Sequence, residues 1–340
     1  MTKRKYNNIE INKLYNEWMI SQEILNKLLQ QCNGDKRKEY EVYNILERWF
    51  ITNANSSLIE SILPSKQLTN DNNKKITDEL LEKKIFNNYS SSRNFIEDVI
   101  NIKDKFVKNT KTNIIIKYNS IRYKDFYFKI EPKRLNLLMR IGDKKSLLLI
   151  CLKYASIISK GQQWGIPINT YRTLYYLYNV RCEGFASPFN SRLLEISSND
   201  IKYCSLFPTY DKVFGSIGNI FDVDLLECEA WCINPPFIEL IMKNIAIKIK
   251  NSLEEAKKME KKLMIFYIMP EWVDADAYQI LYNISDEYKK YYYRLTRNRY
   301  YYTFNDKKII AKFNSIILVF DTYSDIKDNL YQDIEKTMLL

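Results

Sequence analysis

The sequence predicts an α/β protein in which helices cover both faces of a parallel sheet, preceded by a helical module. Two observations predict this fold. From about residue 113 onward, short apolar runs alternate with longer helical patterns, whereas the first 110 residues are polar and place their apolar residues at helical spacing. With 340 residues, the chain is long enough for one large domain with a sizeable core and a smaller module.

The first part, residues 1–112, is the expected helical module. Its apolar residues between Ile11 and Trp18, and between Tyr43 and Phe50, recur at helical spacing. The polar run 71–75 is expected to be a loop. Two roles remain open for this module: a structural cap on the following domain, or a basic arm that holds a nucleic-acid strand.

The second part, residues 113–325, is the expected α/β domain, and residues 326–340 form a C-terminal tail. Pro270 is expected to stop the most apolar of its strands. Strands are expected at 113–118, 127–130, 204–207, 230–233, 264–268, 309–313 and 316–320, and helices at 135–141, 147–158, from about 169, at 238–262 and at 274–284.

The stretch 291–302 interleaves tyrosines with Arg294, Arg297 and Arg299. Arginine pairs with phosphates and aromatic rings stack on bases, so one interpretation is a ribbon that follows RNA. The alternative is an amphipathic edge strand or hairpin with buried tyrosines.

The net charge is +11 and the pI is about 9.1. Such a surplus favours a polyanionic partner, usually nucleic acid. Compositional drift is the alternative, because Asn, Ile, Lys and Tyr are abundant, as in AT-rich genomes. No apolar run approaches the length of a membrane span, and Met1–Tyr6 leads into no signal-peptide stretch, so we expect an intracellular protein without a membrane partner.

Six cysteines are present without a CxxC pair, so we expect reduced thiols and neither a disulfide framework nor a cysteine zinc site. The chain has no histidine. This excludes Ser-His-Asp and Cys-His nucleophiles, histidine-ligated zinc hydrolases and the zinc base deaminases. No metal site is predicted.

Five of the seven glycines lie between residues 161 and 218. Glycine allows sharp turns and close approach of the backbone to a ligand, so this concentration favours a functional site there over ordinary loop turns. Neither GxGxxG nor GxxxxGK[ST] occurs, so neither a dinucleotide fingerprint nor a P-loop is supported.

The sharpest signal is Asn234-Pro235-Pro236-Phe237, between an expected buried strand and an expected helix. Open α/β sheets bind ligands at such strand ends. The N6 amine of adenine is a poor nucleophile because its lone pair is delocalised into the ring. The Asn234 side-chain carbonyl and the Pro235 backbone carbonyl can accept its two hydrogens. Phe237 can stack on the base.

Proline restricts both its own backbone and that of the preceding residue, so two prolines stiffen this loop. Methyl transfer from a sulfonium needs no histidine, which agrees with the composition. A plain strand-to-helix turn is the structural alternative for Asn234–Phe237.

Four segments in a fixed order extend this reading: 180–190 (Val-Arg-Cys-Glu-Gly-Phe-Ala-Ser-Pro-Phe-Asn), 214–218 (Phe-Gly-Ser-Ile-Gly) with Phe221-Asp222, the Asn234 loop, and 269–272 (Met-Pro-Glu-Trp). Over roughly residues 113–325, this set resembles the cap-specific adenosine N6-methyltransferases known as phosphorylated-CTD-interacting factors.

The resemblance implies a Rossmann-like class I methyltransferase core with an N-terminal helical module, S-adenosylmethionine as cofactor, and capped RNA as partner. It implies methylation of the first transcribed adenosine beside the mRNA cap, with N6-methyladenosine chemistry. Two alternatives remain: a DNA adenine N6-methyltransferase, and a non-catalytic RNA-binding subunit with a methyltransferase-like fold.

The resemblance also implies roles for single residues. A loop-end hydrogen bond is the alternative for Glu183 and Asp222. Gln163 or Trp164 is expected to touch cofactor or base, or to serve in packing. The implied sets are Asn234, Pro235, Pro236 and Phe237 for catalysis; Glu183, Gly184, Phe185, Ala186, Ser187, Pro188, Asn190, Phe214, Gly215, Ser216 and Asp222 for the cofactor; and Glu239, Pro270, Glu271, Trp272, Arg297 and Arg299 for the substrate.

The sequence departs from the family in one respect. Animal members carry a front WW module that docks on the polymerase tail, and we recognise no such module here, so docking on that tail is not expected. The AT-rich composition, the size and this departure favour a virus or cytoplasmic element as the source, and then a cytoplasmic location.

Overall fold

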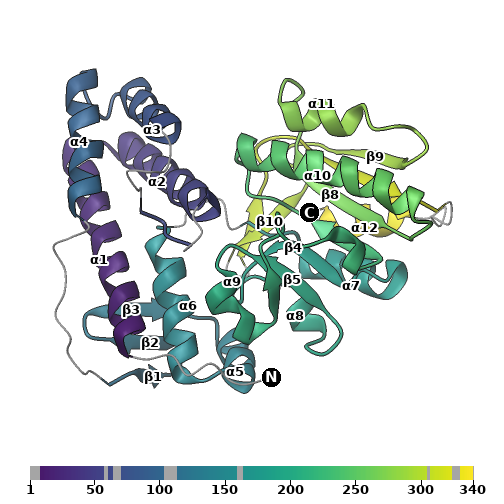
Figure 1. The fold of residues 1–340 in the computed structure, drawn as a ribbon, viewed down its shortest axis with the longest axis horizontal. Coiled ribbons are helices and arrows are strands. Elements are labelled where there is room, and N and C mark those ends of the chain that lie inside the picture. The colour runs from purple at the N-terminus through teal and green to yellow at the C-terminus, as the bar shows by residue number, and fades with distance from the viewer. Residues whose placement is uncertain are drawn as a thin grey trace. The chain divides into compact units, whose positions relative to one another are not determined.

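The computed structural model describes residues 8–56, 60–63, 70–102, 113–158, 164–304, 307–323 and 330–339. They fall into two compact units, residues 1–162 and 163–340, each described by itself below (Figure 1). The boundary between the units falls at 162/163 in the sequence, because residues 113–158 contain a helix that packs along the first helix of the chain. The functional division of the chain stays a prediction.

The first unit begins with helices, as the apolar spacing predicts. Leu14, Leu46 and Phe50 are buried on their inner faces. The loop expected at 71–75 is wrong: these residues form the first turns of a helix. Their Asn and Asp residues suit a helix start, and the buried Ile76 and Leu80 continue the helix. The helices are α1 (Asn8–Gln31), α2 (Lys36–Ser56), α3 (Asn70–Glu82) and α4 (Tyr89–Ile102).

The first unit continues with a three-stranded antiparallel sheet and two helices. Lys153 is buried in the second of these helices, where its ammonium lies 2.9 Å from Glu17 of α1 and donates to the Glu60 carbonyl at 2.7 Å. This buried ion pair joins the two helices. The elements are β1 (Ile115–Lys117), β2 (Ser120–Tyr123), β3 (Phe126–Lys129), α5 (Pro132–Ile141) and α6 (Lys144–Ser156).

The second unit is built on a mostly parallel, seven-stranded sheet in the order β6-β5-β4-β7-β8-β12-β9. The strands from β6 to β8 are parallel, whereas β12 runs antiparallel to both β8 and β9. The unit is therefore mixed α/β and consistent with a Rossmann-like core. The strands are β4 (Cys182–Ala186), β5 (Lys202–Ser205), β6 (Ser216–Gly218), β7 (Ala230–Ile233), β8 (Met264–Pro270), β9 (Lys289–Leu295) and β12 (Ser315–Asp321).

Two of the strands described in the second unit lie outside this sheet. β10 (Tyr301–Phe304) pairs with β11 (Lys307–Ile310) in an antiparallel hairpin of their own. The strand expected at 309–313 therefore ends earlier than the sequence indicates. In the tyrosine-rich stretch 291–302, β9 is an edge strand and Tyr300 and Tyr302 are wholly buried. This agrees with the alternative of an edge strand or hairpin with buried tyrosines.

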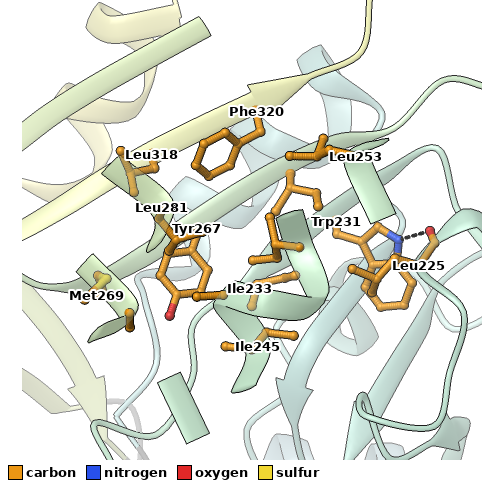
Figure 2. Close-up of a cluster of buried hydrophobic side chains, with 14 of the residues drawn as sticks. Leu225, Trp231, Ile233, Ile245, Leu253, Tyr267, Met269, Leu281, Leu318 and Phe320 are labelled. Carbon is orange, nitrogen blue, oxygen red and sulfur yellow. Dashed lines mark hydrogen bonds between the residues drawn. The ribbon is translucent and has the colours of Figure 1, made fainter. Parts of the chain in front are cut away.

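Helices cover both faces of the large sheet. Trp231, Tyr267 and Leu318 face α10 (Glu239–Lys258) and α11 (Asp276–Tyr282) in one apolar cluster (Figure 2). Their neighbours Cys232 and Phe266 face the other way, toward α7 (Ile168–Tyr178) and α12 (Leu330–Met338). Because residues on both faces are buried, these strands read as continuous apolar runs in the sequence. Short helical turns at α8 (Leu193–Ile196), α9 (Pro208–Asp211), η1 (Lys212–Phe214) and η2 (Leu225–Glu227) complete the connections.

The cysteine expectation is wrong at one place. Cys182 and Cys228 form a disulfide, with their Cα atoms 6.4 Å apart. The sequence gives no hint of it, because residues separated by 46 positions meet only once β4 lies beside β7. The other four cysteines are free and buried. Of the helices that the structure describes, none is long and apolar enough to cross a membrane.

Candidate active site

The carboxyl edge of the large sheet contains a topological switch point. From β4 the chain adds β5 and β6 on one side, and then returns to add β7 and β8 on the other. Connections on the two sides leave in opposite directions, which opens a crevice above β4 and β7. Ligands of open α/β sheets bind at this place. The loops that follow β4 and β7 contain seven of the expected site residues: Ser187, Pro188, Asn190, Asn234, Pro235, Pro236 and Phe237.

Asn234 directly follows β7 and is only 8% exposed. Its side-chain Nδ2 donates a hydrogen bond to the Trp164 carbonyl oxygen at 3.0 Å. Because a carbonyl can only accept, this bond fixes which end of the amide is the oxygen. The buried Oδ1 receives no hydrogen bond from any residue that the structure describes. Burial of an unpaired carbonyl oxygen is costly, so an absent donor is the natural explanation.

The backbone of the loop is held on both sides. Ile233 is fully buried at the end of β7, and the two prolines cannot extend the strand ladder. The Ile238 amide donates to the Pro236 carbonyl at 2.7 Å, which turns the chain into α10 at Glu239. Asn234 therefore sits on a stiff support between a strand and a helix.

An aromatic cluster surrounds this loop. Phe237 lies 6.5 Å from Trp272, 5.7 Å from Tyr302 and 5.8 Å from Phe313, centroid to centroid, in edge-to-face contacts. Trp164 stacks on Phe313 at 6.4 Å and lies 6.1 Å from Tyr302. The structure thus confirms a packing role for Trp164, while Gln163 lies outside the described residues. Half-buried rings beside an unpaired amide oxygen suit a planar, hydrogen-bonding ligand.

The loop after β4 is a tight turn. The Asn190 side-chain oxygen accepts from the Ser187 amide at 2.7 Å and from its hydroxyl at 2.8 Å, closing the turn around Pro188. Phe185, at the end of β4, meets Phe221 edge to face at 6.1 Å. Asp222, in the loop after β6, is exposed on the same edge.

Glu183 lies inside the unit rather than on its surface. Its carboxylate accepts from the Ser191 hydroxyl at 2.8 Å and from the Leu193 amide at 3.4 Å. Burial raises the pKa of Glu183 to about 7, although hydrogen bonds from Tyr171, Ser191 and Leu193 act in the opposite direction. The loop-end hydrogen bond anticipated as an alternative is therefore present, and Glu183 fastens the segment after the Ser187–Asn190 turn to β4.

We expect Glu183→Gln to remove a pH dependence of stability. The folded pKa of about 7 exceeds the ordinary value of 4.5, so the wild-type carboxyl favours folding at low pH and loses that contribution as pH rises from 4.5 through 7. The difference corresponds to roughly 3 kcal/mol at most. Chemical denaturation between pH 4 and 8 should show the variant gaining stability relative to wild type with rising pH. A difference between the two proteins that stays constant over this range would contradict the assignment.

Four of the expected cofactor residues have structural roles that the sequence does not reveal. A Cβ at Gly184 would lie 2.6 Å from Ile220 and 3.0 Å from Ile233, so this glycine lets β4 pass close to its neighbours. Phe214 and Gly215 precede β6, and so the structure does not bring them to the carboxyl edge with the other residues. Phe214 is fully buried, and Gly215 adopts a positive φ of 101°. Ser216 Oγ lies 2.7 Å from Ser205 Oγ in the sheet interior.

The loop after β8 brings together residues that the sequence only partly identifies. Glu271 accepts from Arg294 Nε at 2.8 Å, from Asn314 Nδ2 at 3.0 Å and from the Tyr292 hydroxyl at 3.4 Å, so three side chains hold its carboxylate. Trp272 is 42% exposed beside Phe237. The sequence analysis considers Arg294 only as part of a ribbon that follows RNA, and Asn314 carries no sequence signal. Pro270 ends β8, while Glu239, Arg297 and Arg299 are exposed.

Among the residues that the structure describes, no group of three or more Cys, Asp or Glu side chains is placed to hold a metal ion. The roles of all these residues in catalysis, cofactor binding and substrate binding stay predictions.

A known protein family matches the part of the chain that contains the Asn234 loop and the loops after β4 and β8. The family model described as "Phosphorylated CTD interacting factor 1 WW domain" matches residues 143–304, which run from the start of α6 to the end of β10. A mouse protein named mRNA (2'-O-methyladenosine-N(6)-)-methyltransferase is 33% identical over 112 residues, and its human counterpart is 32% identical over 112 residues. Each alignment covers 33% of this chain and 14% of the relative. Over residues 143–304, the chain is therefore similar to the phosphorylated CTD interacting factor 1 family, and it spans only a small part of the length of these two relatives.

Proposed function

We propose that this chain is an S-adenosylmethionine-dependent RNA methyltransferase that acts on the N6 amine of adenosine. The observation that carries the proposal is the buried Asn234 Oδ1, which has no donor among the described residues while Nδ2 is anchored on Trp164. An exocyclic amine supplies the missing donor. The position of this acceptor at the switch point of the sheet supports a bound ligand at the same place.

The residues on the carboxyl edge fit the cofactor. S-adenosylmethionine supplies a methyl group already activated on a sulfonium. The half-buried Phe185 and Phe221 offer aromatic faces for an adenine, and the exposed Asp222 carboxylate can accept from ribose hydroxyls. The Ser187–Asn190 turn offers a compact backbone beside them. These groups would hold the cofactor next to the Asn234 loop.

The Asn234 loop performs the chemical work through orientation. Asn234 Oδ1 accepts one amine hydrogen, which draws the nitrogen lone pair out of conjugation with the ring. Phe237 holds the plane of the base by stacking. Bound S-adenosylmethionine would supply the methyl carbon to the amine nitrogen that Asn234 orients: a carbon–nitrogen bond would form as the carbon–sulfur bond breaks, and the excess amine proton would leave to water. Orientation of this kind contributes a large part of many enzymatic rate enhancements.

The substrate class comes from the relatives. The mouse and human proteins are named as methyltransferases of 2'-O-methyladenosine in mRNA. We therefore propose the first transcribed adenosine of capped RNA as the substrate. The net charge of +11 supports a nucleic-acid substrate.

The experiment supplies labelled S-adenosylmethionine to the purified full chain with three substrates: capped RNA beginning with A, the same RNA uncapped, and duplex DNA. We expect label on the first adenosine of the capped RNA. Label on uncapped RNA or on DNA would support methyl transfer but contradict capped RNA as the specific substrate. Binding of the cofactor without methyl transfer to any of the substrates would contradict the proposed enzymatic activity. Binding of RNA without binding of the cofactor would indicate a non-catalytic RNA-binding subunit.

A further inference from the structure

One face of the three-stranded sheet of the first unit is lined mainly by exposed side chains. Arg122 of β2 lies directly opposite Tyr127 of β3. Ser120 of β2 lies between Lys117 of β1 and Lys129 of β3, which are paired with it on either side. We call Lys117, Arg122, Tyr127 and Lys129 the cationic sheet face. All four side chains are exposed.

The opposite face of the same sheet is buried and fixes its orientation. Phe126 meets Trp18 edge to face at 5.0 Å, and Tyr123 meets Tyr15 at 5.7 Å. Trp18 and Tyr15 belong to α1. The cationic sheet face is therefore a rigid surface, because the rings behind it are locked in the interior of the unit.

The charge on this face is of one sign. Lys117, Arg122 and Lys129 form ion pairs with no residue in the described ranges, so their charges are available to a partner. The only acidic residue between positions 115 and 129 is Asp125, whose carboxylate accepts from the Tyr15 hydroxyl of α1. The Arg122 guanidinium lies 5.0 Å from the centre of the Tyr127 ring, which places a cation and an aromatic face together.

An exposed aromatic ring stands at the edge of this face. Tyr118, in the turn between β1 and β2, is 97% exposed and has a φ of 53°. That left-handed conformation suits Gly or Asn, and an aromatic residue adopts it at a cost. Burial does not explain Tyr118, because it contributes nothing to the core. A ring held out beside Lys117 suits stacking on a ligand.

We propose that the cationic sheet face and Tyr118 bind single-stranded RNA. The three cations pair with backbone phosphates, and the rings of Tyr118 and Tyr127 stack on unpaired bases. An acidic peptide would use the cations but not the exposed rings. An anionic membrane would attract the cations, but membrane-binding surfaces typically add Trp, Phe or Leu side chains that insert into the lipid. This face has instead a tyrosine beside an arginine.

This surface goes beyond the proposed methyl transfer. It precedes the family-matched residues 143–304, and RNA could bind there whether or not the chain methylates it. The test therefore measures binding alone, with an uncapped probe and without cofactor. Asn283→Ala, at an exposed position directly after α11 with no role in the proposed methyl transfer, should leave this binding unchanged.

The experiment measures fluorescence anisotropy of a labelled, unstructured, uncapped RNA of about 20 nucleotides against the full chain at several salt concentrations. The test variant combines Lys117→Glu, Arg122→Glu and Lys129→Glu. The matched control combines Lys250→Glu, Lys258→Glu and Lys261→Glu, which reverse the same number of exposed charges in and just after α10. A second test variant combines Tyr118→Ala with Tyr127→Ala.

We expect the sheet triple variant to weaken RNA binding at least about tenfold and to lower the slope of log affinity against log salt by about 2. The control triple should lose far less. The tyrosine variant should lose affinity without changing the salt slope. Equal losses of RNA affinity in the sheet triple variant and the control triple variant would mean that only the net charge of the protein matters, which would overturn the proposal. Loss of binding to vesicles of phosphatidylserine and phosphatidylcholine, with RNA binding unchanged, would assign the face to a membrane instead.

Discussion

Asn234→Ala should abolish most methyl transfer while leaving the fold and cofactor binding in place. The substitution removes the buried acceptor Oδ1 and also the Nδ2 bond to the Trp164 carbonyl. Loss of one preorganised hydrogen-bonding group at a reacting centre typically lowers kcat by about 10²–10³-fold. Single-turnover transfer to capped RNA measures the chemical step directly, and titration with S-adenosylmethionine measures cofactor affinity.

A matched control comes from Asn283→Ala, the same change at an exposed position at the end of α11, where Nδ2 donates to the Gln279 carbonyl at 2.9 Å. Its activity should match that of the wild type. Asn234→Asp separates the two roles of the amide, because it keeps an acceptor but cannot donate to Trp164. Wild-type turnover in Asn234→Ala would overturn the catalytic role of this loop.

The fold of the second unit was largely predictable, because its central strands are buried on both faces and read as plain apolar runs. β7 matches the expected 230–233, and β8 extends the expected 264–268 to Pro270. β4 and β6 escaped prediction. β4 contains the buried Glu183 and the close-packed Gly184, and β6 has three residues, so neither shows a strand pattern. Local sequence does not report strands whose polar residues find partners elsewhere in the fold.

The site was predictable where it depends on contiguous residues. The Asn234 loop is contiguous in the sequence and could be identified from its residue types, whereas residues 187–190 were singled out only through the family resemblance. The contacts that complete them are not local: Trp164 reaches Asn234 across 70 positions, and Asn314 reaches Glu271 across 43. Such partners emerge only when the sheet is assembled. The unpaired state of Asn234 Oδ1 is likewise a property of the packed structure.

Phe237→Ala should weaken RNA binding at the proposed active site without affecting the cofactor. Its half-buried ring is held edge to face by Trp272, Tyr302 and Phe313, which leaves a face for a base. Stacking of one base on an aromatic ring contributes about 1–3 kcal/mol, so kcat/KM should fall roughly tenfold to a hundredfold. We expect the fall mainly in KM for RNA, measured by steady-state kinetics at saturating S-adenosylmethionine.

The alternative explanation for such a loss is damage to packing, since Phe237 also contacts the apolar clusters on both faces of the sheet. Phe237→Tyr distinguishes the two, because it keeps a stacking face and should retain most of the activity. Tyr176→Ala, at a 70% exposed position on α7, controls for the loss of an aromatic ring elsewhere. A fall in cofactor affinity equal to the fall in RNA affinity would mean that Phe237 supports the loop rather than the base. In that case Asn234 alone would have to orient the amine, and the aromatic cluster would be part of the core.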